Sequence, residues 1–405
     1  MPRTETPRYG LRRAVAAVLG VFILVVGVGV PVAIVSPVPA AVAHVSAAEL
    51  EDTRAADPAL PSFGSAGIGA VGLPGLLAKS GPQRPRTMAS ITKIVTALVV
   101  LEAKPLGPKE QGPTITFTQR DVSILSDVIA RNGSWQEVRA GWRTSERAAL
   151  ETMLIPSANN YATSLAVWAY GSEGAYLKAA RAWLGQHHLD DTTVFDANGL
   201  DEDNRSTPAD LVELGRLALA DPVVASIVRK PSAQEPNVGG LENTNELLGD
   251  DGIDGIKTGT YTTGANLLFS ADVTVGSRTV QLVGVILGAR THPELDAKVP
   301  ALLRSVRKGL HDVELTTRGE SFATYRMHWG GVAHAVPKRS ESMLVWGRVR
   351  VERHADVKRI TGGRKGERVG SVTYSVGKRT VSVPLVLDRD VLAAPVWWRL
   401  THPVR

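Results

Sequence analysis

The chain has 405 residues, enough for two or three domains, and 43% of them are hydrophobic. It contains no cysteine, which excludes disulfide bonds, thiolate catalysis and cysteine-based metal sites. Its formal net charge of +6 indicates anionic surroundings such as nucleic acid, phospholipid or anionic wall polymer. No segment interleaves basic and aromatic residues as nucleic-acid-binding modules do, so we favour an envelope surface.

The first 35 residues combine a basic start with a long apolar segment. No charged residue occurs from Ala14 to Val35, and this segment is long enough to cross a bilayer as one helix. The basic residues that precede it favour a cytoplasmic N-terminus: Arg3, Arg8, Arg12 and Arg13. We favour a retained membrane anchor because the segment exceeds the usual core of a signal peptide. Cleavage near 41–43, giving a secreted protein, is the alternative. Either way the remainder lies outside the cytoplasm, whereas the arginine flank argues against a buried core helix.

Residues 36–60 are rich in Pro, Ala and Ser and predict a linker. A larger domain is expected over 61–310, where helix and strand patterns mix. Its predicted elements are a strand pair over 65–79, a helix through the apolar run 91–101, a strand at 114–117, helices at 146–154, 161–183 and 206–217, paired strands at 267–274 and 279–287, and a helix at 297–309. Short β-type runs at 342–351, 369–376 and 380–387 predict a small all-β domain over 311–405.

A serine and a lysine, Ser90 and Lys93, stand three residues apart at the start of the apolar run. On a helix these positions share one face, so the hydroxyl and the amine can meet. A serine hydroxyl is a poor nucleophile until a base takes its proton, and a lysine enclosed among apolar groups can act as that base near neutral pH. An isolated Ser-x-x-Lys sequence is nevertheless more often a helix cap followed by a solvated lysine.

Two further motifs follow in order, Ser157-Ala158-Asn159 and Lys257-Thr258-Gly259. Each motif alone is typical of a helix cap or of a strand edge, but the ordered set is specific. It resembles the penicillin-recognising serine acyl-transferases, which include penicillin-binding proteins and serine β-lactamases.

The closer similarity is to low-molecular-mass D-alanyl-D-alanine carboxypeptidases, over roughly residues 62–310. It is carried by the segments that flank the motifs, namely Met153-Leu154-Ile155-Pro156 before Ser157, Asn243-Thr244-Asn245 before Lys257, and the segments 195–200 and 206–210. The resemblance implies an α/β (α+β) fold of the DD-peptidase and β-lactamase type. In that fold an antiparallel sheet is flanked by helices, and here a small all-β C-terminal domain would follow.

The resemblance also implies roles at the reacting bond. Ser90 would attack the carbonyl between two terminal D-alanines, and Lys93 would accept its proton as a neutral amine. Ser157 would pass a proton to the leaving amine. Asn159 would hydrogen-bond the substrate amide and help to hold Lys93, and a water would then release the acyl group.

Four residues are expected at the carboxylate end of the substrate. Lys257 and Thr258 would bind the terminal carboxylate with a cation and a hydroxyl. Gly259 would let the substrate backbone lie close, because it has no Cβ. The backbone N–H groups of Thr260 and of the nucleophilic serine would form the oxyanion hole.

The expected partners are peptidoglycan stem peptides ending in D-Ala-D-Ala, β-lactams as inhibitors and the membrane, without nucleic acid. No cofactor or metal is expected, because His187-His188 has no partner at ligand spacing. Two other functions stay open. A β-lactamase is disfavoured because no Glu-x-x-Leu-Asn sequence lies between Asn159 and Lys257, and the intact motifs argue against a catalytically idle envelope scaffold.

Overall fold

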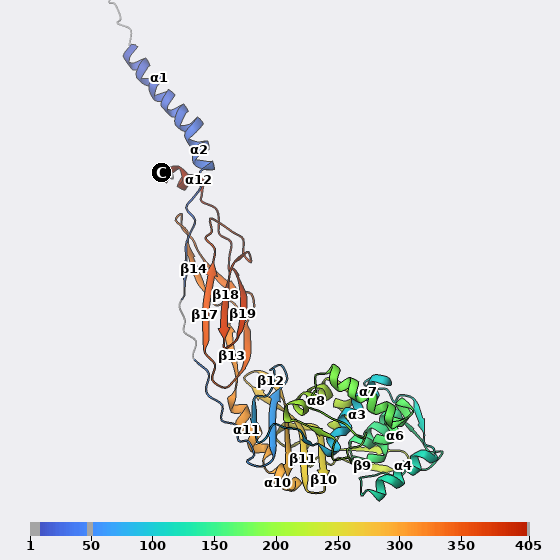
Figure 1. Cartoon of the computed structure of the whole chain (residues 1–405). Coiled ribbons are helices and arrows are strands. Elements are labelled where there is room, and N and C mark those ends of the chain that lie inside the picture. The colour runs from blue at the N-terminus through green and yellow to red at the C-terminus, as the bar shows by residue number, and fades with distance from the viewer. Residues whose placement is uncertain (1–8, 47–51, 403–405) are drawn as a thin grey trace, which may run out of the picture. The chain divides into compact units, whose positions relative to one another are not determined.

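The chain folds into two compact units (Figure 1). The computed structural model describes residues 9–46 and 52–402. One unit, the helix–sheet unit, comprises residues 55–312 and 345–347. The other, the β unit, takes the described parts of 1–54, 313–344 and 348–405. The predicted class, an antiparallel sheet flanked by helices and followed by a β-rich region, is confirmed.

The helix–sheet unit is built on a five-stranded sheet in which all neighbouring strands are antiparallel. The strands, in spatial order, are β10 (Ile253–Tyr261), β11 (Gly264–Val275), β12 (Arg278–Ala289), β2 (Ser65–Ala70) and β3 (Ala78–Ser80). The predicted pairings of 65–79 and of 267–274 with 279–287 are therefore confirmed. Strand β10 forms one edge, so one of its sides is free to line a cavity.

Helices cover both faces of this sheet. Helix α8 (Pro208–Ala220) packs on β2 and β12. The hydrophobic core on this face of the sheet includes the strand residues Leu268 and Val283. The amphipathic helix α11 (Val299–Gly309) contacts β11, with Leu302 among its buried residues. Because neither face meets water, β11 and β12 are apolar along most of their length rather than alternating.

A buried helix, α3 (Thr92–Ala103), lies at the centre of the helical layer. All ten residues 92–101 are buried, and such a helix must be surrounded by other elements. Its neighbours are α5 (Glu146–Leu154), α6 (Asn159–Tyr170), α7 (Glu173–Gln186) and α8.

The stretch 161–183 is helical as predicted, but it is divided between two helices. Helix α6 ends at Gly171, whose φ of 79° is a left-handed conformation that glycine adopts without strain. Ser172 then accepts a hydrogen bond from Ala175 N and caps α7.

Shorter elements complete the helix–sheet unit. Three strand pairs are β4 (Arg86–Thr87) with β7 (Arg205–Ser206), β5 (Thr114–Thr116) with β6 (Arg143–Ser145), and β8 (Ser232–Glu235) with β9 (Gly239–Glu242). The remaining helices are α4 (Gln119–Ala130), α9 (Pro222–Val228), α10 (His292–Asp296) and the 3-10 turns η2 (Ala89–Ile91) and η3 (Asp250–Gly252). Strands β13 (Leu310–Thr316) and β16 (Glu341–Trp346) pair with each other, and most of their residues belong to the β unit.

The β unit contains a six-stranded sheet whose first strand comes from the far end of the sequence. Its spatial order is β1 (Ala43–Val45), β14 (Ala323–Arg326), β15 (Val332–Pro337), β19 (Arg379–Leu387), β18 (Arg368–Val376) and β17 (Val351–Val357). The predicted run 342–351 is not one strand, because β16 ends before Gly347 and β17 begins at Val351. A short helix, α12 (Val396–Thr401), follows the last strand.

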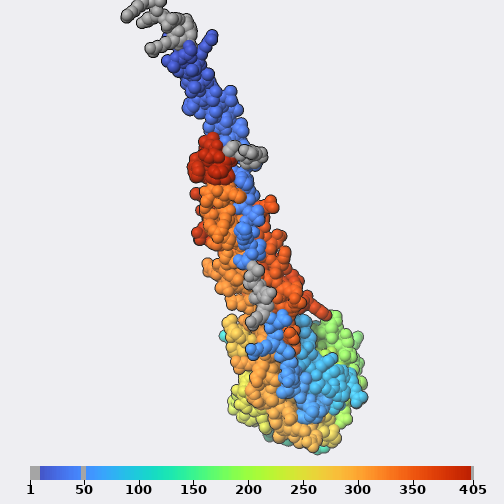
Figure 2. Space-filling view, turned by 90° about the vertical axis from the view of Figure 1, so that its left-hand side faces the viewer, coloured from blue at the N-terminus to red at the C-terminus, as the bar shows by residue number. Residues whose placement is uncertain are grey.

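The segment predicted as a linker differs in the structure. Ala43–Val45 pairs with β14, and Ala41 is 1% exposed and forms a bridge with Ile360. Figure 2 shows this blue segment running along the orange and red strands of the β unit. Its Pro, Ala and Ser content resembles that of a linker, but part of it pairs with a strand about 280 residues further along the chain.

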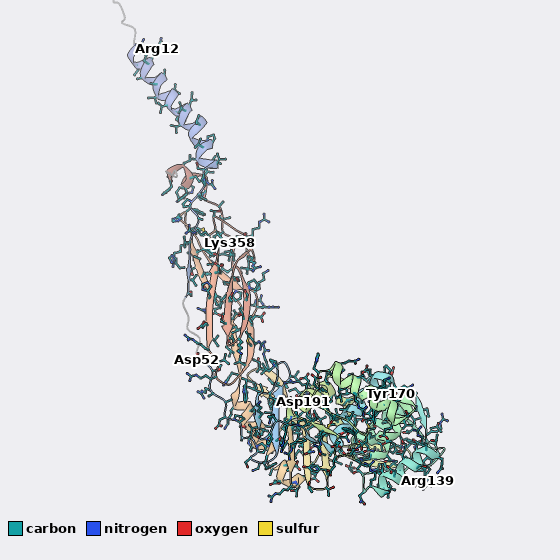
Figure 3. All side chains as sticks on the ribbon, viewed as in Figure 1. Arg12, Asp52, Arg139, Tyr170, Asp191 and Lys358 are labelled. Atoms are coloured by element: carbon teal, nitrogen blue, oxygen red, sulfur yellow. The ribbon has the colours of Figure 1, made fainter. Side chains whose placement is uncertain are left out.

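The N-terminal apolar segment is helical, as predicted. It consists of α1 (Tyr9–Leu24), a π-helical turn at Val25–Gly29 and α2 (Val30–Val35). The stretch Gly10–Val35 has a mean hydropathy of 2.9 and is not buried, so it is long and apolar enough to cross a membrane. Arg12, labelled in Figure 3, lies near its start, while Arg3 and Arg8 lie outside the described residues.

Candidate active site

Ser90 and Lys93 are in direct contact. Ser90 lies in η2, the single 3-10 turn that leads into α3, and the Lys93 Nζ lies 2.9 Å from the Ser90 Oγ. The same amine donates to the Asn198 carbonyl oxygen at 2.6 Å. Lys93 is fully buried, so its pKa lies well below the usual value, first because of burial and second because the Lys257 charge is near. A neutral amine beside a serine hydroxyl is the arrangement that an activated nucleophile requires.

A loop that follows α7 fixes the second partner of Lys93. Asp196 accepts hydrogen bonds from the backbone N–H groups of Asn198, Gly199 and Asp201 at 2.6–3.1 Å. These bonds hold the Asn198 carbonyl toward the lysine. The sequence marked 195–200 only as a turn that resembles relatives, and no local pattern indicated that a backbone oxygen would position the base.

The second motif also contacts the Asn198 carbonyl, through Asn159. Ser157 lies between α5 and α6 with a φ of 66°, an uncommon conformation for a residue with a Cβ, and it lines the cavity beside Ser90. The Asn159 Nδ2 donates to the Asn198 carbonyl at 3.2 Å. Asn159 and Lys93 therefore donate to the same backbone oxygen.

The third motif places a second buried lysine on the edge strand β10. Lys257 is 1% exposed, and its Nζ donates to the Thr258 hydroxyl at 3.2 Å and to the Thr244 hydroxyl at 3.4 Å. The two hydroxyls are 2.5 Å apart. Burial lowers the pKa of Lys257 to about 7. The predicted site residues do not include Thr244, although the resemblance includes the sequence Asn243-Thr244-Asn245.

Gly259 and Thr260 continue the edge strand past the nucleophile. A Cβ on Gly259 would lie 2.7 Å from the Met88 carbonyl oxygen, so glycine lets β10 approach the turn that carries Ser90. The Thr260 hydroxyl lies 2.8 Å from the His292 Nε2. Burial, and then the nearby Lys257, lower the pKa of His292, a residue that the sequence did not single out.

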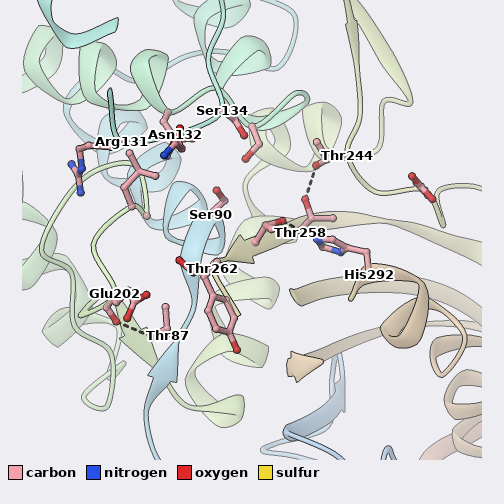
Figure 4. A pocket seen from close by; sticks show the side chains of 18 of the residues that line it. Thr87, Ser90, Arg131, Asn132, Ser134, Glu202, Thr244, Thr258, Thr262 and His292 are labelled. Atoms are coloured by element: carbon pink, nitrogen blue, oxygen red, sulfur yellow. Dashed lines mark hydrogen bonds between the residues drawn. The ribbon is translucent and has the colours of Figure 1, made fainter. Parts of the chain in front are cut away.

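These residues surround one cavity of about 740 Å³ (Figure 4). Its lining includes Ser90, Ser157, Asn159, Thr244, Thr258 and Thr260. All three predicted motifs therefore meet in one place, with Lys93 and Lys257 buried behind the wall. No group of three or more metal-ligating side chains occurs among residues 9–46 and 52–402.

A serine hydroxyl in contact with one buried lysine, with a second buried lysine on a sheet edge, is the arrangement expected of the penicillin-recognising serine acyl-transferases. A sequence model of the D-alanyl-D-alanine carboxypeptidase family matches residues 75–291, just over half of the chain. The chain belongs to this family.

Individual relatives agree with this assignment. The D-alanyl-D-alanine carboxypeptidase DacD of Escherichia coli is 24% identical over 342 residues, which cover 80% of this chain and 86% of the relative. DacB2 of Mycobacterium tuberculosis, another carboxypeptidase, is 31% identical over 196 residues, 47% of this chain and 63% of the relative. A D-alanyl-D-alanine endopeptidase of Pseudomonas aeruginosa is 30% identical over 213 residues, 51% of this chain and 65% of the relative.

Solved structures share the fold. Penicillin binding protein 5 of Haemophilus influenzae superposes with a TM-score of 0.59 at 19% identity, covering 82% of this chain and 99% of that chain. PBP3 of Streptococcus pneumoniae gives a TM-score of 0.60 at 20% identity, covering 84% of this chain and all of that chain. The predicted fold class is thereby confirmed.

Proposed function

We propose that this protein is a serine-type D-Ala-D-Ala carboxypeptidase that removes the terminal D-alanine from peptidoglycan stem peptides. The observation that carries the proposal is the Lys93 amine, which is completely buried and lies 2.9 Å from the Ser90 hydroxyl at the cavity wall. Membership of the D-alanyl-D-alanine carboxypeptidase family supports the choice of substrate.

The acylation step uses Ser90, Lys93 and Ser157. The Ser90 Oγ attacks the carbonyl carbon of the penultimate D-alanine, and its proton passes to the neutral Lys93 Nζ. The proton then reaches the leaving amine through the Ser157 hydroxyl as the peptide bond breaks. The product is an ester between Ser90 and the shortened peptide, which water hydrolyses with Lys93 again acting as the base.

The other end of the cavity binds the part of the substrate that leaves. The protonated Lys257 and the hydroxyls of Thr258 and Thr244 match a carboxylate, since a cation and two donors converge there. The backbone N–H groups of Ser90 and Thr260 serve as the oxyanion hole. Asn159 hydrogen-bonds the substrate amide.

We place the enzyme at the outer face of the cell membrane. The exposed apolar stretch Gly10–Val35 and the arginines before and at its start support an anchor with the catalytic unit outside, where peptidoglycan lies. If the segment is a signal peptide instead, the enzyme is secreted. β-Lactams, which mimic the acyl-D-alanine group, would acylate Ser90.

The test compares the full chain with its Ser90→Ala variant. A fluorescent penicillin should label only the parent protein, and D-alanine should appear from a pentapeptide ending in D-Ala-D-Ala only with the parent. Labelling of the Ser90→Ala variant, or no D-alanine release by the parent, would reject the proposal.

The same samples separate the neighbouring activities. Rapid nitrocefin turnover would indicate a β-lactamase, and cleavage of cross-linked dimers with no D-alanine release would indicate an endopeptidase like the relative of P. aeruginosa. Mass spectrometry of muropeptides distinguishes these products directly.

A further inference from the structure

The cavity continues on both sides of Ser90. Figure 4 shows Thr244, Thr258 and His292 on one side and Arg131 and Glu202 on the other. In the proposed reaction the first side holds the leaving D-alanine. The second side must therefore face the acyl part of the substrate, which is the peptide that precedes the scissile bond.

The loop that carries Arg131 is bonded to the second motif a few residues further on. It is the first residue after α4, and its backbone N donates to the Asp127 carbonyl at 3.1 Å. Three residues later, the Ser134 carbonyl accepts a hydrogen bond from the Asn159 backbone N at 2.8 Å. The loop that begins with Arg131 is thus fixed to the helix that carries Asn159.

In the described part of the chain, the guanidinium N–H groups of Arg131 form no hydrogen bond with a neighbouring carboxylate. Its nearest carboxylates, Asp127 and Asp196, lie at 3.9 and 4.0 Å, which is beyond hydrogen-bonding distance. Asp196 already accepts several hydrogen bonds from its own loop. The Arg131 side chain is 43% exposed and lines the cavity, so its forked donors are available to a carboxylate on a ligand.

Glu202 contributes the opposite charge to the same wall. It is exposed and lines the cavity, and its backbone carbonyl accepts a hydrogen bond from the Thr87 hydroxyl at 2.8 Å. Within the part of the chain that the structure describes, its carboxylate has no ion pair or hydrogen bond. The wall that faces the acyl group therefore presents a guanidinium whose two carboxylate neighbours lie beyond hydrogen-bonding distance, and an exposed carboxylate.

We infer that Arg131 determines specificity by binding a free carboxylate on the residue that precedes D-Ala-D-Ala, while Glu202 receives the ammonium of the same residue. The preferred substrates are then stem peptides whose third residue is a diamino dicarboxylic acid such as diaminopimelate, rather than lysine. This inference rests on the proposed carboxypeptidase function.

The experiment measures D-alanine release from three pentapeptides, with diaminopimelate, side-chain-amidated diaminopimelate or lysine at the third position. The parent protein should favour free diaminopimelate about tenfold in kcat/KM over the other two. Arg131→Ala should remove this preference by raising KM for the diaminopimelate peptide alone, with kcat unchanged. Arg131→Lys should restore part of the preference, because a lysine keeps the charge without the fork.

Arg139→Ala is the matched control. Arg139, labelled in Figure 3, pairs with Glu137 at 2.6 Å and is 66% exposed, and it is not part of the cavity. This variant should behave like the parent on every peptide. Equal rates on all three peptides, or an equal loss on all three in Arg131→Ala, would overturn the inference while leaving the function intact. An absence of both penicillin labelling and D-alanine release would reject the function, and the inference with it.

Discussion

At the scale of single residues, the site depends on two buried lysines that need opposite charge states. Lys93 must be neutral to accept the serine proton, and Lys257 must be protonated to bind a carboxylate. Burial lowers the pKa of both, and the charge of Lys257 lowers that of Lys93 further. The second lysine thus helps to keep the first one neutral.

We predict a bell-shaped pH profile for kcat/KM of acylation by a penicillin. The rate should fall at low pH as Lys93 becomes protonated, and it should fall above about pH 7 as Lys257 loses its proton in the free enzyme. Lys257→Arg should move the alkaline limb upward, because a guanidinium stays charged. Stopped-flow acylation from pH 5 to 9.5 measures both limbs. An active Lys257→Arg variant with an unmoved alkaline limb would contradict this assignment.

A glycine beside the nucleophile gives a second prediction at this scale. Gly199 has a φ of 85°, and a Cβ there would lie 2.3 Å from the Ala89 carbonyl oxygen. Gly199→Ala should therefore displace Ser90 and reduce acylation at least about tenfold, as small misplacements of reacting groups do. Gly171→Ala is the control, since its φ of 79° is similar but no atom lies within 4 Å of an added Cβ. Equal effects of the two substitutions on labelling would show that backbone strain, and not the clash, is responsible.

At the scale of elements, helix α5 links a buried carboxylate at one end to Ser157 just beyond the other. Glu146 is its first residue and is fully buried, and its two carboxylate oxygens have no hydrogen-bond partner among the described residues. Burial raises the pKa of Glu146 to about 7, although Lys104 and Arg147 oppose the shift. The first residue of the helix is therefore a carboxyl whose charged form is destabilised by burial.

We predict that Glu146→Gln stabilises the protein above pH 7. The carboxyl ionises near pH 4.5 when unfolded and near pH 7 when folded, so folding stability falls as the pH rises through this window. The amide removes that loss and should raise the free energy of unfolding by about 1 kcal/mol or more at pH 8, with little change at pH 4. Urea denaturation at both pH values tests this. The exposed Glu242→Gln should show no such pH-dependent gain, and a destabilised Glu146→Gln at pH 8 would contradict the argument.

At the scale of the whole molecule, the N-terminal region has two separable parts. The apolar helix through Val35 is exposed, whereas the segment that follows belongs to the β unit through Ala41 and β1. Removal of the first part should therefore affect location, and removal of the second should affect stability.

Two truncations test this division. Deletion of residues 1–35 should release the protein from membranes and leave penicillin labelling unchanged, and it should change the thermal transition of the β unit little, because it removes only the contact of α2 with α12. Deletion of residues 1–46 should lower that transition by several degrees, because it uncovers the edge strand β14 and removes the buried Ala41 with its bridge to Ile360. Identical melting curves for the two truncated proteins would mean that the segment is only a linker.

The sequence alone determined the features that depend on local order along the chain. Ser90 and Lys93 are three residues apart, so one turn brings them together. The strands 267–274 and 279–287 are joined by a short turn, so their pairing was predictable. The apolar helix follows from length and hydropathy. The three motifs could be predicted to meet, although only through the resemblance to a family.

Only the tertiary structure decided the contacts between distant segments. The Asn198 carbonyl that holds both Lys93 and Asn159 is a backbone atom, and backbone atoms leave no signature in a sequence. Thr244 joins Lys257 because of how the chain turns before β10. Strand β1 is a strand because β14 lies beside it, and its own residues only permit that pairing. Local propensity sets what a segment can form, and burial against partners far along the chain sets which of those forms is stable.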